Sequence, residues 1–205
     1  MIKNFIEKSW LLIIASLAFG VLLAVTNSLL AERIRANEIA KFNKLAGEMI
    51  EDANSFAAVS EDGIEITSTK GKNIEVDVKK ALDPEGNLVG FAFVAEGSGF
   101  QDKIKLVITA DAKFETVLGF GVLLSNETPG FGDKINRTEH YFAKQFVGTP
   151  AKKLELSKIG DWKIIDDDIE IIAITGATVT SEAVVSIFNN YVEQVKTKLQ
   201  EKGLL

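Results

Sequence analysis

The sequence predicts an α+β protein, in which a single N-terminal transmembrane helix is followed by a mostly antiparallel sheet domain with flanking helices. Three observations predict it: an uncharged apolar run at residues 10–30, a series of strand-like apolar segments in the middle of the chain, and helical patterns on both sides of that series. Strands in runs with helices at their ends are typical of α+β folds. The roughly 170 residues outside the membrane suffice for one core and hardly for two.

The first feature is the run from Trp10 to Leu30, which contains no charged residue. As a helix it would span roughly 30 Å, the thickness of the hydrocarbon core of a bilayer. Because Lys3 and Lys8 precede it, a cleaved signal peptide is the alternative. The run is long for a signal peptide, however, and no small-x-small cleavage site follows it cleanly. We therefore expect an uncleaved transmembrane helix at residues 10–30, behind a short cytoplasmic segment at residues 1–9.

The orientation of this anchor is less directly determined. More Lys and Arg residues lie shortly after the run than before it, which favours a C-terminal end inside the cell. Long domains are translocated largely regardless of such charges, and a short Lys-bearing segment before the run is typical of an uncleaved signal anchor. We expect a single-pass protein of the cytoplasmic (inner) membrane, with its C-terminal domain on the periplasmic or extracellular side.

The remaining elements follow in order along the chain. Apolar residues at helical spacing predict a juxtamembrane helix within residues 31–60, ending near Asn54. Polar residues predict turns at 60–63, 68–73 and 83–87, and a bend at 111–113. Strands are expected at residues 74–78, 88–95, 103–110, 114–124 and 170–174, and helices at residues 141–146 and 180–202. Residues 61–205 are thus expected to form one domain.

The composition excludes several classes of function. The chain has 29 acidic and 23 basic residues, a net charge of −6, no cysteine and a single histidine, His140. A strongly basic nucleic-acid-binding protein is excluded, as are disulfides, thiolate metal sites and cysteine nucleophiles. One histidine cannot build a His-rich metal site, and no metal site is expected. Any redox chemistry must therefore reside in a borrowed cofactor.

The first loop with residues suited to ligand binding spans residues 127–134, directly after an expected strand. Its sequence is Glu-Thr-Pro-Gly-Phe-Gly-Asp-Lys. Its Pro-Gly pair alone indicates an ordinary turn. The second glycine adds another flexible point, and a bulky Phe131 between two glycines is unusual for a simple turn. Glycines allow the backbone to approach a planar or phosphorylated ligand closely. We expect a ligand to be bordered by Glu127, Thr128, Gly130 and Phe131, although Phe131 could instead pack into the core.

The second loop is residues 175–181, Thr-Gly-Ala-Thr-Val-Thr-Ser, which links the last expected strand to the last helix. A helix N-terminus presents unpaired N–H groups and a positive partial charge, so it favours a phosphate. Gly176 and Ala177 leave space beside Thr178. The alternative is purely structural, because Thr and Ser are common N-cap residues and this helix needs a cap in any case.

Together the two loops resemble a known family. The sequence from Thr175 to Thr178 is similar to the flavinylation motif of FMN-binding domains, Ser/Thr-Gly-Ala-Thr. The sequence from Glu127 to Ile135 resembles a signature of the G subunit of the Rnf ion-translocating electron-transport complex, which is related to the longer C subunit of the sodium-pumping NADH:quinone reductase. Because both motifs occur in order behind one N-terminal anchor, the resemblance covers nearly the whole chain.

The resemblance implies a covalently bound FMN, esterified through its phosphate to Thr178 by a separate flavin transferase. Thr178 would then be an attachment point rather than a catalytic residue, with Thr175, Gly176 and Ala177 beside it in the cofactor site. The chain would be a non-catalytic electron-carrying subunit of a membrane complex that couples ferredoxin/NAD electron transfer to ion translocation. Its partners would be the other integral and peripheral subunits, with no nucleic acid involved, and its domain would lie outside the cytoplasm.

Two departures from the family pattern leave alternatives open. Family members often carry an acidic residue six positions before the modified Thr, where this chain has Ile172, and residues 97–102 match the family's Gly-Tyr-Gly-Gly loop only loosely. One alternative is an anchored FMN domain that serves another extracytoplasmic reductase. The other is an unflavinylated module that helps to assemble a complex and in which the two loops are only turns.

Overall fold

The structure, a computed structural model, describes residues 2–60, 63–68, 71–158 and 169–205. The chain divides into two compact units, Met1–Ala40 and Lys41–Leu205. Helix α1 (Ile2–Met49) makes up the first unit and contributes its last turns to the second. In the region Ser9–Met49 it is long and apolar enough to cross a membrane, and its most apolar stretch is not buried. This helix indicates a single-pass membrane anchor, as the sequence predicts.

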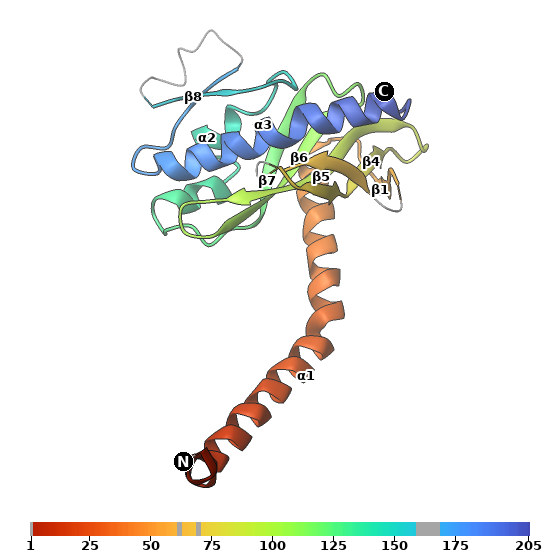
Figure 1. Cartoon of the computed structure of the whole chain (residues 1–205). Coiled ribbons are helices and arrows are strands. Elements are labelled where there is room, and N and C mark those ends of the chain that lie inside the picture. Colours follow the sequence, from red (N-terminus) through yellow and green to blue (C-terminus); the bar gives the residue numbers. More distant parts are fainter. Residues whose placement is uncertain (1, 61–62, 69–70, 159–168) are drawn as a thin grey trace. The chain divides into compact units, whose positions relative to one another are not determined.

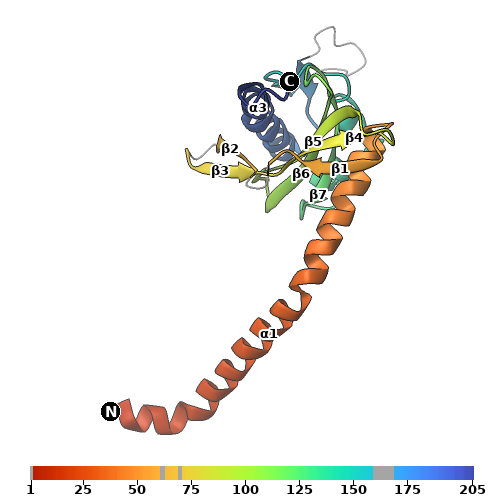
Figure 2. The same ribbon diagram turned by 90° about the vertical axis from the view of Figure 1, so that its right-hand side faces the viewer.

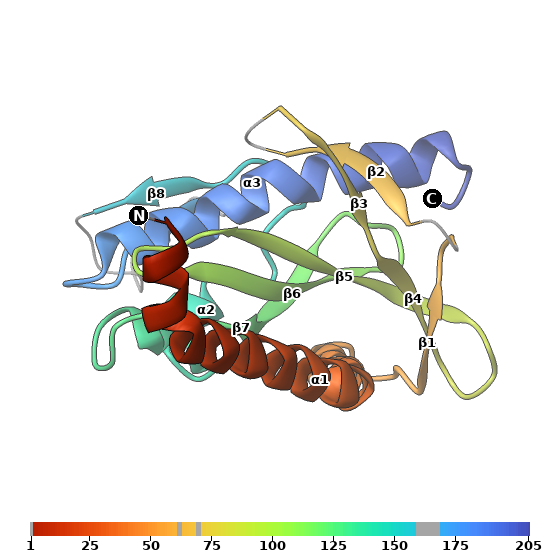
Figure 3. The same cartoon turned by 60° about the horizontal axis from the view of Figure 1, so that its bottom comes forward.

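The second unit is built on a five-stranded sheet with the order β1-β4-β5-β6-β7 (Figures 1 and 3). Every neighbouring pair in it is antiparallel. Asp83 fixes the expected turn between β4 and β5, because its Oδ1 accepts hydrogen bonds from the backbone N–H groups of Glu85 and Asn87 at 2.9 and 2.8 Å. The strands are β1 (Ser55–Ala58), β4 (Val78–Leu82), β5 (Leu88–Ser98), β6 (Lys103–Asp111) and β7 (Val117–Leu124).

In the described part of the chain, two small sheets and three helices complete this unit. β2 and β3 form an antiparallel hairpin, and β8 and β9 pair in parallel. These elements are β2 (Ile64–Thr67), β3 (Asn73–Val76), the 3₁₀ helix η1 (Gly132–Asn136), α2 (Tyr141–Lys144), β8 (Glu155–Ser157), β9 (Glu170–Ile172) and α3 (Thr178–Glu201). The α+β class with a mostly antiparallel sheet is therefore confirmed.

The main sheet is covered on both faces, which explains why its central strands are nearly continuously apolar. On one face Phe91 and Phe93 of β5 belong to a core shared with Phe188 and other residues of α3, which lies on that side of the sheet (Figure 2). On the other face Ala92 packs in a second core with Phe42 from the last turns of α1. Successive residues of a strand point to opposite faces, so β5 contributes to both cores.

The start of the globular unit differs from the prediction. α1 ends at Met49 rather than near Asn54, and the rest of the expected juxtamembrane segment 31–60 includes strand β1. The physical reason is packing: Phe42 of the helix contacts Phe56 of β1 edge-on, with ring centroids 5.9 Å apart. The compact unit that contains the sheet begins at Lys41.

Other boundaries also shift. The single strand expected at 74–78 is divided between β3 and β4, which belong to different sheets. β7 begins at Val117 and not at residue 114, because the buried Phe114 (φ +53°) lies in the preceding turn. α3 begins at Thr178, two residues earlier than the predicted start at residue 180. β1, β2 and β8 were not predicted. The turns expected at 60–63 and 68–73 include residues that lie outside the described ones.

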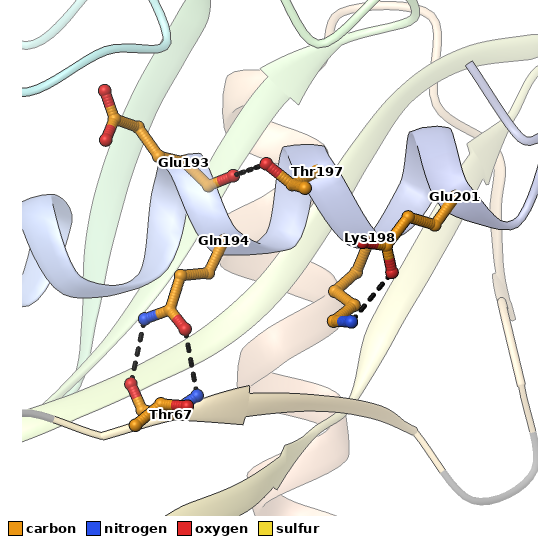
Figure 4. A network of polar contacts seen from close by, with 6 residues as sticks. All are labelled: Thr67, Glu193, Gln194, Thr197, Lys198 and Glu201. Atoms are coloured by element: carbon orange, nitrogen blue, oxygen red, sulfur yellow. Dashed lines mark hydrogen bonds and ion pairs between the residues drawn. The ribbon is translucent and has the colours of Figure 1, made fainter. Parts of the chain in front are cut away.

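The β2–β3 hairpin is fastened to the C-terminal half of α3 by an amide that pairs with a strand backbone (Figure 4). Gln194 accepts a hydrogen bond from the N–H of Thr67 at 2.9 Å and donates one to its carbonyl at 2.8 Å. Nearby on the helix, Lys198 forms an ion pair with Glu201 at 2.7 Å. These contacts stabilise the end of α3 that is remote from the two motif loops.

Candidate functional site

The two motif loops meet at the N-terminus of α3, where they border a pocket of ≈ 430 Å³. This volume lies in the range of about 300 to 1,000 Å³ that is usual for small-molecule sites. Three segments supply the wall: the β5–β6 loop, the loop after β7, and the first turn of α3 with the residues before it. The lining residues are Phe100, Thr128, Phe131, Gly132, Gly176, Ala177, Thr178, Val179 and Thr180.

The structure brings most of the predicted site residues together. Five of them line the pocket: Thr128, Phe131, Gly176, Ala177 and Thr178. The other three do not. Gly130 and Thr175 are exposed to solvent outside the pocket, and Glu127 is buried behind its wall.

The N-terminus of α3 is open towards the pocket. The N-cap residue, Ala177, has no side chain that could cap the helix. The first N–H with an acceptor inside the helix is that of Ser181, which donates to the Ala177 carbonyl at 3.0 Å. The N–H groups of Thr178, Val179 and Thr180 precede it and have no intrahelical acceptor. With the helix dipole they form a site for an anion, although no Lys, Arg or His lines the pocket.

The hydroxyls of the second loop differ in their availability. Ser181 is fully buried; its Oγ accepts from the Ile174 N–H at 2.9 Å and donates to the Ala177 carbonyl at 3.0 Å. Thr180 donates its hydroxyl proton to Glu127 at 2.5 Å. Thr178 is half-buried and lines the pocket, and within the described part of the chain its hydroxyl has no hydrogen-bond partner. Thr178 therefore carries the free hydroxyl of this pocket.

Exposed apolar side chains surround the opening. Phe131 is 53% exposed and Phe100 is 66% exposed, so Phe131 does not pack into the core. The ring of Phe131 lies against Gly176, whose φ is +81°, and a Cβ added at Gly176 would be 3.1 Å from the ring. A left-handed glycine is thus required both by the turn and by the aromatic contact. Exposed aromatic rings beside a pocket suit a planar, partly apolar ligand.

Four lining residues were not predicted: Phe100, Gly132, Val179 and Thr180. The signal for Phe100 was present in the sequence, because a large apolar residue in a Gly-rich strand connection has no evident place in the core. A hydrogen bond of 2.9 Å from the Asn126 amide to Asp102 links this connection to the loop after β7. That bond and the Lys103 N–H lower the pKa of Asp102. Among the described residues no cluster of His, Asp or Glu could hold a metal ion.

Comparison with known proteins agrees with this geometry. Residues 99–193 match the model of a family described as the FMN-binding domain. This stretch contains all three segments of the pocket wall. This part of the chain is therefore similar to FMN-binding domains. The motif-based prediction of this domain is thereby confirmed.

Relatives extend the similarity beyond the FMN-binding domain. The G subunit of the ion-translocating oxidoreductase complex of Methanosarcina acetivorans is 29% identical over 187 residues, which cover 91% of this chain and 92% of the relative. The protein of the same name from Shewanella loihica is 28% identical over 90% of this chain and 86% of the relative. The predicted resemblance to a G subunit is thus confirmed over nearly the whole length.

A solved structure supports the fold. The crystal structure of Shewanella oneidensis NqrC superimposes with a TM-score of 0.56 and 21% identity, covering 73% of this chain and 72% of that one. At this level of identity the similarity concerns the fold alone.

Proposed function

We propose that this protein is an electron-transfer subunit, with FMN attached covalently to Thr178, of a membrane complex that couples ferredoxin/NAD electron transfer to ion translocation. The observation that carries the proposal is the free Thr178 hydroxyl at the uncapped N-terminus of α3, inside a pocket built from both motif loops. The match to the FMN-binding domain and the similarity to the G subunits support the same assignment.

The pocket has suitable groups for each part of FMN. The backbone N–H groups at the start of α3 would face the phosphate, whose negative charge the helix dipole favours. Phe131 and Phe100 offer apolar surface to the isoalloxazine ring, and Thr128 offers a polar edge. FMN, when bound, supplies transfer of one or two electrons, which no side chain of this chain provides.

Covalent attachment would use the oxygen of Thr178. This oxygen forms a P–O bond to the flavin phosphate, while its proton and the leaving group of an activated flavin nucleotide, supplied with the transferase, depart. The net gain in mass is that of FMN less one water. A tether suits a carrier on the outer side of the membrane, because a dissociated cofactor would be lost there.

The test is coexpression of the full chain with a flavin transferase, followed by a denaturing gel and intact-mass measurement. We expect a fluorescent band with the mass of the FMN adduct, and its complete loss in Thr178→Ala. Thr175→Ala is the matched control, because Thr175 belongs to the same loop but is exposed outside the pocket, and it should remain fluorescent. A dark wild-type band would favour an assembly module without flavin.

The proposed partners can be tested separately from the flavin. Mild solubilisation of the native membrane and purification through this chain should recover other integral and peripheral subunits together with it. Recovery of a flavinylated chain alone, or with an unrelated reductase, would instead support an anchored FMN domain of another pathway.

We further propose that the N-terminus is cytoplasmic and the FMN-binding domain lies on the periplasmic or extracellular side. The chain has no cysteine, so a single cysteine at Lys152, which is exposed, gives a clean label site. A membrane-impermeant thiol reagent should label it in intact cells, once any outer membrane is made permeable. Labelling only after lysis would place the domain inside the cell and overturn the proposed topology.

A further inference from the structure

A buried carboxylate lies directly behind the wall of the flavin pocket. Glu127 is 5% exposed. Its Oε2 accepts a hydrogen bond from the Thr180 hydroxyl at 2.5 Å, and its Oε1 accepts one from the Gln101 N–H at 3.1 Å. In the described part of the chain no Lys, Arg or His forms an ion pair with it. Buried acidic residues are rare and are usually paired with a cation, so this one needs a specific explanation.

The backbone around Glu127 is shaped to fit the carboxylate. A Cβ at Gly99 would collide with Oε1, and a Cβ at Gly132 would lie 2.9 Å from Oε2. Neither glycine has a left-handed φ, so neither is required by backbone conformation. At Gly132 the space is taken by Glu127 and its hydrogen-bond partner Thr180, and at Gly99 it is taken by Glu127 together with the Asp102 carbonyl and the Ile104 side chain.

The contacts of Glu127 join all three segments of the pocket wall. Gln101 follows Phe100 in the β5–β6 loop, Glu127 precedes Thr128 in the loop after β7, and Thr180 is in the first turn of α3. The Asn126–Asp102 hydrogen bond links two of these segments, and the contact of Phe131 with Gly176 links another two. Glu127 forms hydrogen bonds to the other two segments at once, so it helps to fix the walls relative to one another without itself lining the pocket.

The carboxylate also places a charge at this position. Both of its oxygens take part in hydrogen bonds, one with the Thr180 hydroxyl and one with the Gln101 N–H. It lies at the N-terminus of α3, where the helix dipole stabilises an anion. A buried charge acts through a medium of low dielectric constant, so its effect on a neighbouring group is larger than that of an exposed charge and is less screened by salt.

We propose that Glu127 is the positioning residue of the flavin pocket and that its fixed negative charge lowers the midpoint potential of the bound flavin. A negative charge behind the wall disfavours the uptake of an electron in front of it. The proposal rests on the proposed function, since it requires the flavin to be present.

The experiment compares full-length, flavinylated variants by spectroelectrochemical titration and by in-gel flavin fluorescence. Glu127→Gln keeps the shape and both contacts, because its oxygen can accept from the Gln101 N–H and its amide can donate to Thr180. Glu182→Gln is the control: it removes an exposed carboxylate two residues along α3 from Thr180 that does not line the pocket. We expect Glu127→Gln to retain its flavin and to shift the midpoint potential to a more positive value at both low and high salt, whereas Glu182→Gln leaves the potential unchanged at high salt.

The outcomes separate this inference from the proposed function. A wild-type chain without flavin contradicts the proposed function. A flavinylated Glu127→Gln variant with an unchanged or more negative potential overturns the role of Glu127 while the proposed function stands. Should Glu127→Gln fail to fold, Glu127→Asp keeps the charge but shortens the tie. It should lose part of its flavin fluorescence and keep a wild-type potential, and a positive shift in Glu127→Asp overturns the inference.

Discussion

Replacing Gly132 by alanine should disrupt the hydrogen bond between Thr180 and Glu127, which lies behind the pocket wall. The added Cβ would lie 2.6 Å from the Thr180 Oγ1 and 2.9 Å from the Glu127 Oε2. Both distances are shorter than a carbon–oxygen contact allows, and the hydrogen bond between these two side chains lies directly in the way. The substitution therefore has to push Thr180 and Glu127 apart.

The magnitude follows from the interactions that are lost. A hydrogen bond to a charged group contributes about 1.5 to 3 kcal/mol, and overpacking of a well-packed site costs about 1 to 3 kcal/mol. Because the same displacement produces both effects, we expect a loss of about 3 kcal/mol in the free energy of unfolding rather than their full sum. Gly130→Ala is the matched control. Gly130 has a φ of +79° and open space around it, so alanine there should cost only about 1 to 2 kcal/mol of backbone strain.

The assay is urea unfolding of the full chain in detergent, followed by circular dichroism, together with in-gel flavin fluorescence. Gly132→Ala should lower the transition midpoint clearly more than Gly130→Ala and should also reduce flavin incorporation. Equal stability of the two variants, with equal flavin content, would refute the packing argument around Glu127.

Three further results are expected. Phe131→Ala should alter the flavin absorption spectrum or midpoint potential while covalent attachment persists; an unchanged spectrum and potential would remove Phe131 from the ring site. Gly121→Val in β7 should destabilise the domain by about 1 to 3 kcal/mol in urea unfolding, because even a Cβ there would lie 2.8 Å from the Leu45 side chain of α1. Burial and two neighbouring cations lower the pKa of His140, whose Nδ1 caps α2 by accepting from the Phe142 N–H at 3.3 Å. The neutral ring therefore contributes its full stability above the unfolded pKa of 6.5, and this stability is lost as the pH falls through the lower folded pKa. The urea midpoint should accordingly fall less on acidification in His140→Asn, whose side chain can also cap the helix, than in the wild type.

Local sequence signals predicted the elements whose formation depends on neighbouring residues. The turn at Asp83 forms through hydrogen bonds to residues two and four positions on, so its sequence predicts it directly. The apolar stripe of α3 and the uncharged run of α1 have lengths and periodicities that only a helix satisfies. Short strands such as β8 carry too few residues for an alternating pattern, and they form because a distant segment supplies the partner.

The end of α1 shows the limit of periodicity. Apolar residues continue at helical spacing beyond Met49, yet the chain turns there and enters β1. Phe42 and Ile50 are buried against the second face of the sheet, and that face exists only after β4 to β7 have assembled. A pattern within one segment does not contain this information.

The sequence by itself predicted the anchor, the α+β class and the two loops, because each depends on residues that are near one another in the chain. The candidate attachment residue, Thr178, followed from the resemblance of its loop to the flavinylation motif. Only the tertiary structure decided which hydroxyl is free and which residues form the wall. Thr180 and Glu127 are 53 residues apart, and their hydrogen bond removes one hydroxyl from the pocket and places Glu127 behind it. Phe100 reaches the opening because β5 and β6 present their connecting loop beside the N-terminus of α3. Such contacts depend on how the sheet and the helix pack, and the free energy of that packing is distributed over the whole core.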